Sequence, residues 1–489
     1  MTSGPISAAS VLLTRDAGSH EVFAVRRAET LRFMGNFWAF PGGKVHADDP
    51  GPYAAAAREL FEETGVLLAR RADGSLPGAT SGLVDARREL LAEKLTWKEL
   101  LASAGLAVNS SDFVYTGSIT TPEFAPVRFD TSFFVAVCPP GQAPDIWPGE
   151  LTEGVWGTAD DLLADWTRGG RLLSPPTVSL LQAVRGRPVD QMPEMAAPLL
   201  KQLANGGHPP IWFSPAVGMI PARTLALPPS THTNAYLVGT DHPHLIDPGP
   251  ADPAEQEKLF ASTDELLNGR SLTAIILTHQ HPDHVGAAMA GARRYGVPIL
   301  AHPITAKMLA NKVRVDALIE DRQTIDLGTA PDHAGSWQLE AILTPGHAPG
   351  HIALYERRYG LLFAGDMIST ASSVVICPPE GNLTEYVASL RKLQEFPARI
   401  LLPAHGSATA RPAHVLQQSL VHRQQREEEL VSLLAGGPQT VKGLAQTVYR
   451  GLPDPLMRFA ELQILAGLQK LEREGRASSA EGGWMGTRS

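Results

Sequence analysis

The sequence predicts an α/β (α+β) multidomain protein divided into residues 1–205, 206–421 and 422–489. A chain of 489 residues is long enough for about three domains. Short apolar runs alternate with helix-forming stretches through the first two parts, as in sheets covered by helices. The last part predicts three helices and a glycine turn. Two mixed sheet-and-helix domains followed by a small helical module are therefore expected.

The composition is that of an ordinary globular protein, with 43% hydrophobic and 19% charged residues. The net charge of −9 provides no overall attraction to nucleic acid or to an anionic membrane. Cys138 and Cys377 cannot form a disulfide framework, which favours a reducing compartment. No signal peptide and no apolar run of membrane-spanning length is found. We expect a soluble, cytoplasmic protein without a membrane partner.

The first part begins with two strand-like runs, Ser7–Thr14 and Glu21–Arg26, joined by a turn. A glycine turn at Phe40–Lys44 precedes a helix that starts near Tyr53 and ends at Gly65, a residue that readily forms a left-handed cap. An insertion at residues 70–105 predicts one or two surface helices. The turn and the helix after it carry the residues of chemical interest.

Three carboxylates lie on one face of that helix, because Glu59, Glu62 and Glu63 are spaced i, i+3 and i+4. Such a cluster repels itself unless cations lie among its members. Carboxylate oxygens suit hard ions such as Mg²⁺ or Mn²⁺, which often bridge to substrate phosphates. A solvated acidic face is the simpler interpretation, and the glycine turn and the order of the charges argue against it.

The stretch Gly43–Val66 resembles a Nudix box. Its second half, Arg58–Val66, matches the pattern Arg-Glu-aliphatic-x-Glu-Glu-x-Gly-aliphatic throughout. Its first half is one residue longer than the pattern and lacks the first glutamate; Asp49 stands where that glutamate would fall, counting from Gly43. Three flanking segments, Arg32–Gly35, Arg128–Phe134 and Leu173–Pro176, are similar to the branch that includes coenzyme A diphosphatases.

The Nudix resemblance implies an α/β/α sandwich that hydrolyses a nucleoside diphosphate linked to another group, such as a coenzyme A compound. It implies that Glu62 and Glu63 bind Mg²⁺ or Mn²⁺ and that Glu59 is a ligand or the catalytic base. Arg58 would orient the glutamates through a salt bridge. The altered first half leaves a second interpretation open, in which this part is a non-catalytic ligand sensor.

The second part contains the densest set of metal-capable side chains. An apolar run at 274–277 predicts a buried strand, and the string Thr278–His284 follows it directly. Imidazole nitrogen and carboxylate oxygen are the usual zinc donors besides thiolate. His279 and His281 alternate along the extended part and can point the same way, whereas Asp283 and His284 begin the next helix. One turn can therefore serve two ions.

Other apolar runs of this part end in the same kind of residue. Strand-like segments lead into Asp247, His347, Asp366 and His405. A single histidine after a strand is usually a hydrogen-bonded core residue. Four such cases in one segment instead indicate strands of one fold that deliver their ends to a common rim.

This part resembles the metallo-β-lactamase superfamily along essentially its whole length. The resemblance implies an αββα sandwich with a dinuclear metal centre, usually two Zn²⁺ ions. One ion would be held by His279, His281 and His347, the other by Asp283, His284 and His405, with Asp366 bridging and with Asp247 and His351 bracing the ligands from behind. The antibiotic-hydrolysing branch commonly has cysteine as the bridging residue, so the aspartate argues against β-lactam hydrolysis.

The expected chemistry at this centre is hydrolysis by an activated water, because two adjacent divalent ions lower the pKa of a shared water towards about 7. Asp283 would also serve as a catalytic residue that orients the attacking group. The stretch Thr344–His351 resembles the glyoxalase II motif, and together with a coenzyme-A-like first part it favours a thioester or related small molecule. The alternative is cleavage of single-stranded RNA, because residues 215–478 resemble the β-lactamase-like protein 2 branch of endoribonucleases.

The last part predicts helices at 423–434, 440–449 and 456–474, in an order that suggests a winged-helix-like module. Such modules often bind nucleic acid, but residues 423–489 hold nine Lys and Arg against eight Asp and Glu. This balance is unfavourable for binding phosphates. A packing role or a homodimer contact is the competing expectation.

Overall fold

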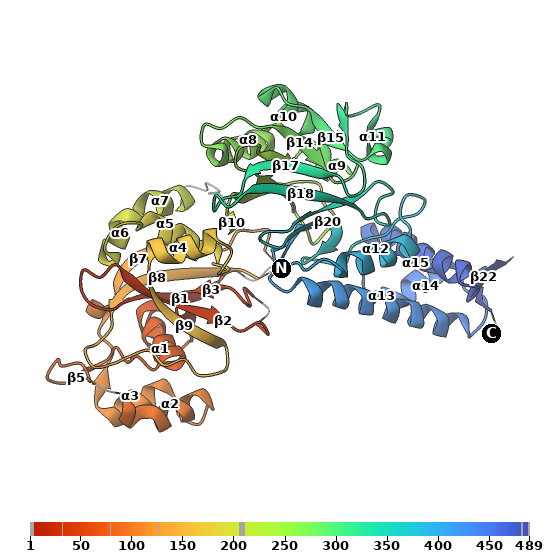
Figure 1. The fold of residues 1–489 in the computed structure, drawn as a ribbon. Coiled ribbons are helices and arrows are strands. Elements are labelled where there is room, and N and C mark those ends of the chain that lie inside the picture. Colours follow the sequence, from red (N-terminus) through yellow and green to blue (C-terminus); the bar gives the residue numbers. More distant parts are fainter. Residues whose placement is uncertain are drawn as a thin grey trace. The chain divides into compact units, whose positions relative to one another are not determined.

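The computed structural model describes residues 4–31, 33–78, 80–125, 127–204, 211–480 and 483–487 (Figure 1). The chain forms two compact units, Met1–Pro215 and Ala216–Ser489, each with its own core. The predicted boundary at 205/206 lies outside the described residues. The mixed α/β multidomain class is confirmed.

The first unit is built on a mixed sheet of order β3-β2-β1-β8-β7, with β4 paired to β1 and β9 paired to β2. Its strands are β1 Ile6–Thr14, β2 Glu21–Arg27, β3 Trp38–Ala39, β4 Gly42–Lys44, β7 Val114–Thr120, β8 Phe129–Val137 and β9 Leu151–Thr158. Its helices are α1 Pro52–Thr64, α2 Val84–Leu91, α3 Trp97–Ala104, α4 Ala159–Thr167, α5 Pro175–Ala183, α6 Met192–Met195 and α7 Ala197–Ala204; the short strands β5 Arg70–Arg71, β6 Leu106–Ala107 and β10 Ile211–Ser214 complete it.

Both faces of this sheet are covered, because successive side chains of a strand point to opposite faces. Val11 and Leu13 of β1 belong to the core formed with α1, whereas Leu12 belongs to the core formed with α4 and α5. The first unit is thus the expected α/β/α sandwich. Helices α2 and α3 confirm the predicted surface helices of the insertion.

The second unit contains two sheets. One includes, in order, β11 Val217–Arg223, β12 His232–Val238, β13 His244–Ile246, β14 Ala274–Leu277, β15 Ile299–Ala301 and β16 Ala317–Leu318; the other is β17 Thr324–Thr329, β18 Ser336–Leu343, β19 Ile352–Glu356, β20 Leu361–Ser369 and β21 Ile400–His405. Tyr236 of β12 packs edge-on against Phe363 of β20, with ring centroids 5.3 Å apart, so the sheets share a core.

Helices cover the outer face of each sheet. α8 Pro253–Leu267 and α10 Ala288–Tyr295 contact the first sheet, α12 Leu383–Gln394 and α13 Pro412–Leu434 contact the second, and the short α9 Pro282–Val285 and α11 Pro303–Leu309 follow β14 and β15. This is the predicted αββα sandwich (Figure 1). Within the described residues, no helix is both long and apolar enough to cross a bilayer.

The C-terminal module consists of the end of α13, α14 Val441–Val448, α15 Asp454–Arg473 and the hairpin of β22 Ala477–Ala480 and β23 Gly483–Gly486. Helix α13 begins at Pro412, not at Arg423 as predicted, and therefore runs without a break through the predicted boundary at 421/422. Ala466 of α15 packs into the core beneath the second sheet, which supports the packing role. The three-part division and the homodimer stay predictions.

Candidate metal centre

The turn between β14 and α9 is held from behind by Asp247, which is 2% exposed and follows β13. One carboxylate oxygen of Asp247 accepts a hydrogen bond from the Thr278 amide at 2.8 Å. The other accepts from the Thr278 hydroxyl at 2.6 Å and from Nδ1 of His284 at 2.8 Å. Asp247 adopts a φ of +49°, which aspartate tolerates better than most residues. The predicted bracing role of this residue has the required geometry.

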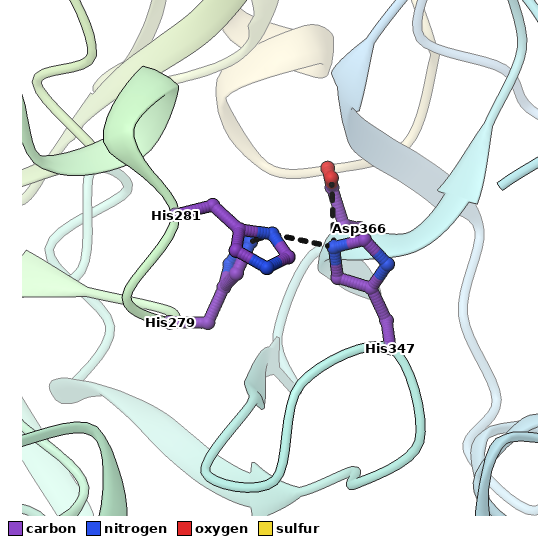
Figure 2. A group of neighbouring side chains, drawn as sticks. All are labelled: His279, His281, His347 and Asp366. Carbon is purple, nitrogen blue, oxygen red and sulfur yellow. Dashed lines mark hydrogen bonds and ion pairs between the residues drawn. The ribbon is translucent and has the colours of Figure 1, made fainter. Parts of the chain in front are cut away.

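Four side chains meet at the first group of potential ligands, which Figure 2 shows pointing toward one another from three separate segments. Nδ1 of His281 lies 2.9 Å from Nε2 of His279 and 2.9 Å from Nε2 of His347. Nε2 of His347 lies 3.3 Å from a carboxylate oxygen of Asp366. The sequence separates these residues by up to 87 positions, and the fold brings their donor atoms within 4.8 Å of one another.

The second group consists of Asp283, His284 and His405, whose donor atoms also lie within 4.8 Å of one another. Asp366 reaches this group with its other oxygen, which lies 3.4 Å from Nε2 of His284 and 3.3 Å from Nε2 of His405. Asp366 therefore stands between the two groups, as predicted from the sequence. Thr233 of β12 donates to Asp283 at 3.3 Å.

Hydrogen bonds behind the imidazoles orient their free nitrogens toward the centre. Nδ1 of His347 donates to the carbonyl of Val375 at 2.9 Å, and Nδ1 of His405 donates to the carbonyl of His232 at 2.9 Å. Nδ1 of His279 lies 3.0 Å from the Thr278 hydroxyl. Such outer contacts select the ring tautomer and the nitrogen that is left for a metal.

His351 lies directly behind the bridging position. Its Nε2 accepts the Asp366 amide at 3.0 Å, so Nδ1 carries the proton and donates to the Thr344 hydroxyl at 2.8 Å. Gly365 has a φ of +49°, and a Cβ there would lie 2.4 Å from Nε2 of His351. The backbone at Asp366 is thus packed so closely on His351 that only glycine fits before it.

The donor atoms fit divalent cations. Nε2 of His284 and one carboxylate oxygen of Asp366 are buried without a well-formed hydrogen bond, and buried polar atoms are rarely left unpaired. Burial and then the neighbouring His347 lower the pKa of His281 to about 4. Burial would raise the pKa of Asp366, but His405 and His284 hold it well below the usual range. Burial would lower the pKa values of His284 and His405, but the charge of Asp366 raises them, so these two imidazoles would release their protons to bind a cation.

A second cluster of ionisable groups lies in the first unit. Arg58 of α1 is 4% exposed and contacts three carboxylates: Asp49 at 3.0 Å, Glu59 at 2.9 Å and Glu62 at 3.0 Å. It also donates to the carbonyl of Lys44 at 2.8 Å. The predicted salt bridge to the glutamates is present, and Asp49 supplies the acidic partner that the altered first half of the box lacks.

Glu59 and Glu63 have raised pKa values, so each would release its proton when a cation binds. Burial, and then the charge of Glu59, raise the pKa of Glu63 to about 8, and burial raises the pKa of Glu59 to about 7. Glu63 accepts the Gly42 amide at 2.8 Å, and a Cβ on Gly43 would lie 2.5 Å from the Glu59 carboxylate. Among the described residues, however, the three glutamates do not form a ready cluster of metal-ligand atoms.

Several groups that form hydrogen bonds to the candidate ligands were not predicted from the sequence. Thr233 and the carbonyls of His232 and Val375 act on the ligands through the fold, and no sequence pattern marks a backbone carbonyl. Thr344 directly precedes the Pro-Gly-His motif, so its place beside that motif was a usable signal. Asp366 lies inside β20, not just after a strand as predicted, because β20 continues to Ser369 beyond an irregularity at Gly365.

Comparison with known proteins agrees with this geometry. Residues 229–405 match the family described as metallo-beta-lactamase superfamily, residues 4–81 match the NUDIX domain, and residues 440–484 match the beta-lactamase associated winged helix domain. The hydroxyacylglutathione hydrolase GloC of Haemophilus influenzae is 32% identical over 191 residues, which are 36% of this chain and 86% of that protein. The chain belongs to the metallo-β-lactamase superfamily.

This metallo-β-lactamase superfamily hydrolase carries an N-terminal NUDIX domain and a C-terminal winged helix domain. It is 26% identical over 259 residues to the beta-lactamase-like protein 2 homolog of Drosophila melanogaster, covering 50% of this chain and 83% of that protein. It is 27% identical over 255 residues to the atrochrysone carboxyl ACP thioesterase of Aspergillus fumigatus, covering 50% of this chain and 76% of that protein. Both hydrolase families are metal-dependent.

Proposed function

We propose that the centre of the second unit binds two zinc ions and hydrolyses a thioester or a related small molecule. The observation that carries the proposal is the pair of ligand groups that share Asp366. His279, His281 and His347 would hold one ion; Asp283, His284 and His405 would hold the other. When bound, such a pair supplies an activated water and neutralises negative charge that develops on the substrate.

Residues of the centre would also hold the ligands in place, accept a proton or orient the attacking group. Asp247 and His351 keep the ligands in place through the hydrogen bonds described above. Asp283 presents a carboxylate at the second group, 3.4 Å from His405, where it can accept a proton or orient the attacking group. Neither a serine nor a cysteine is needed as a nucleophile, because the attacking group is a water.

The relatives and the charges of the winged helix favour a thioester over RNA. One relative is named a thioesterase and another a hydroxyacylglutathione hydrolase. Three cations of this part already pair with carboxylates: Lys470 with Glu427 at 2.8 Å, Arg426 with Glu429 at 2.6 Å and Arg476 with Glu474 at 3.2 Å. Paired cations contribute little to phosphate binding.

Incubation of the zinc-loaded protein with S-lactoylglutathione, an acyl-CoA and unstructured RNA tests the proposal. We expect release of a free thiol from a thioester and no shortening of the RNA. His281→Ala should abolish the turnover, because this side chain contributes a donor atom to the first group. Cleavage of RNA with intact thioesters would replace the proposal by the endoribonuclease alternative, which the beta-lactamase-like protein 2 homolog represents among the relatives.

For the first unit we propose Mg²⁺- or Mn²⁺-dependent hydrolysis of a nucleoside-diphosphate-linked compound, such as a coenzyme A derivative. Support comes from Asp49, which stands where the missing glutamate would fall and pairs with the buried Arg58 at 3.0 Å. Glu62 and Glu63 would bind the ion, and Glu59 would act as a ligand or base. The alternative is a ligand sensor without catalysis.

Replacement of Glu62 and Glu63 by glutamine separates these two functions. Glutamine keeps the size of each side chain but removes the charge that would hold a divalent cation. We expect diphosphatase activity of the wild-type protein, assayed by chromatographic detection of the two phosphate monoester products, to fall at least about 100-fold in Glu63→Gln and Glu62→Gln, a loss typical of a removed electrostatic contact in an active site. A wild-type protein that binds the nucleotide without consuming it, in the presence of Mg²⁺ or Mn²⁺, would support the sensor.

A further inference from the structure

Three successive residues between β20 and α12 are each fixed by a different part of the second unit. The carbonyl of Val374 accepts from Nη2 of Arg423 at 2.5 Å. The carbonyl of Val375 accepts from Nδ1 of His347 at 2.9 Å. The amide of Ile376 donates to Oε1 of Gln463 at 2.8 Å. We call Val374–Ile376 the strap, since it joins one of the candidate ligands to two helices of the C-terminal module.

The two outer anchors come from α13 and α15. Arg423 is 5% exposed, and its guanidinium lies 5.0 Å from the centre of the Tyr386 ring. A buried arginine in contact with an aromatic face is held firmly, because it has little room to adopt another rotamer. Gln463 is half-buried on α15 and provides the acceptor for the Ile376 amide.

The Val375 carbonyl, in the middle of the strap, determines which ring nitrogen of His347 is left free to face the first group. Its ring can offer Nε2 to the first group only while Nδ1 carries the proton, and the Val375 carbonyl is the acceptor that keeps the proton there. Displacement of the strap would remove this acceptor. The Tyr386 ring beneath Arg423 provides a second connection, since its hydroxyl donates to the carbonyl of Met367 at 2.8 Å, directly after Asp366.

We propose that Arg423 and Gln463 are positioning residues for the metal centre, and that the winged helix module acts on the centre by holding the strap. The proposal rests on the proposed function, because it concerns the binding of an ion by His347. In this proposal the module acts on the metal centre of the same chain. The centre is therefore incomplete when α13 and α15 are displaced.

The test uses the full-length protein and measures its affinity for Zn²⁺ by competition with a chromophoric chelator, together with the visible spectrum of the Co²⁺-loaded protein. Gln463→Met removes the acceptor and keeps the side-chain length, whereas Gln463→Glu retains an acceptor oxygen. Arg423→Met is the second disruptive variant. Lys470→Met is the control, because Lys470 is buried in the same module and pairs with Glu427 and Glu474, away from the strap.

We expect Gln463→Met and Arg423→Met to weaken one of two bound zinc equivalents by about 10- to 100-fold, as for other residues that orient a metal ligand. The cobalt spectrum should change with them, while Gln463→Glu and Lys470→Met retain wild-type affinity. Wild-type zinc affinity and spectrum in Gln463→Met would overturn the proposal. If Arg423→Met does not fold, Gln463→Met alone tests the proposal, because Gln463 is only half-buried. Failure of the wild-type protein to bind two equivalents would instead overturn the proposed function.

Discussion

Asp366→Ala is expected to abolish hydrolysis at the centre of the second unit, lowering turnover by at least about 1,000-fold. One carboxylate oxygen lies 3.3 Å from His347 in the first group, and the other lies 3.3 Å from His405 in the second. No other residue faces both groups in this way among the described residues. Loss of Asp366 therefore removes a ligand from both candidate sites, whereas loss of any one histidine affects a single site.

The measurement is the zinc content of the purified variant by elemental analysis, together with turnover on the substrate found for the wild-type protein. We expect fewer than two equivalents of zinc in Asp366→Ala. Asp326→Ala is the matched control, because Asp326 is exposed and its carboxylate contacts His242 at 3.5 Å and the Gly328 amide at 3.0 Å, neither of which belongs to the two ligand groups. Two tightly bound equivalents and normal turnover in Asp366→Ala would show that the two groups do not share this residue.

Arg58→Met is expected to destabilise the first unit by about 3 kcal/mol near neutral pH, the lower end of the range for removing one partner of a buried ion pair. Methionine fills much of the space of the arginine stem but removes the charge shared by Asp49, Glu59 and Glu62. The buried carboxylates would then repel one another without compensation.

The pH dependence of this loss follows from the direction of the pKa shifts. Burial already raises the pKa of Glu59 from 4.5 to about 7 in the wild-type fold, so ionisation of Glu59 opposes folding as the pH rises through this interval. Removal of the arginine strengthens that opposition. The deficit of Arg58→Met should therefore be smaller at pH 4.5 than above pH 7, because the contribution of Glu59 appears only as the pH rises through about 7.

Chemical denaturation of wild-type and variant protein between these pH values measures the deficit directly. Divalent cations should reduce it, because they replace part of the lost positive charge. The control is Arg15→Met, since Arg15 is exposed and pairs with Glu21 on the surface, where such pairs contribute at most about 1 kcal/mol. A deficit that does not change with pH would show that lost packing, not lost charge, is its cause.

The sequence was most informative where chemistry and local structure coincide. The string from Thr278 to His284 follows a strand whose side chains are all buried, and its alternation placed His279 and His281 on one side. Helix α1 begins with proline and ends at Gly65, which caps it with a φ of +72° as expected. These features depend on neighbours within a few positions, so they can be read without the fold.

The sequence was least informative where a contact depends on distant parts of the chain. The boundary predicted at 421/422 falls inside the continuous helix α13. A helix can continue from one domain into the next without any local interruption in the sequence. The pairing of Asp49 with Arg58 depends on the path of an irregular loop. The acceptor of His347 is a backbone carbonyl, which every residue has, so its identity cannot be inferred from residue type.

By itself, the sequence determined the resemblance to two hydrolase families, the ligands that this resemblance implies, and the kind of ion that imidazole and carboxylate donors suit. Only the tertiary structure decided how closely the donor atoms approach one another, which hydrogen bonds orient them, and that Arg423 and Gln463 reach the strap. The physical reason is that a metal centre requires donor atoms a few Å apart in space. Such distances are determined by the packing of whole sheets and helices and not by separation along the chain.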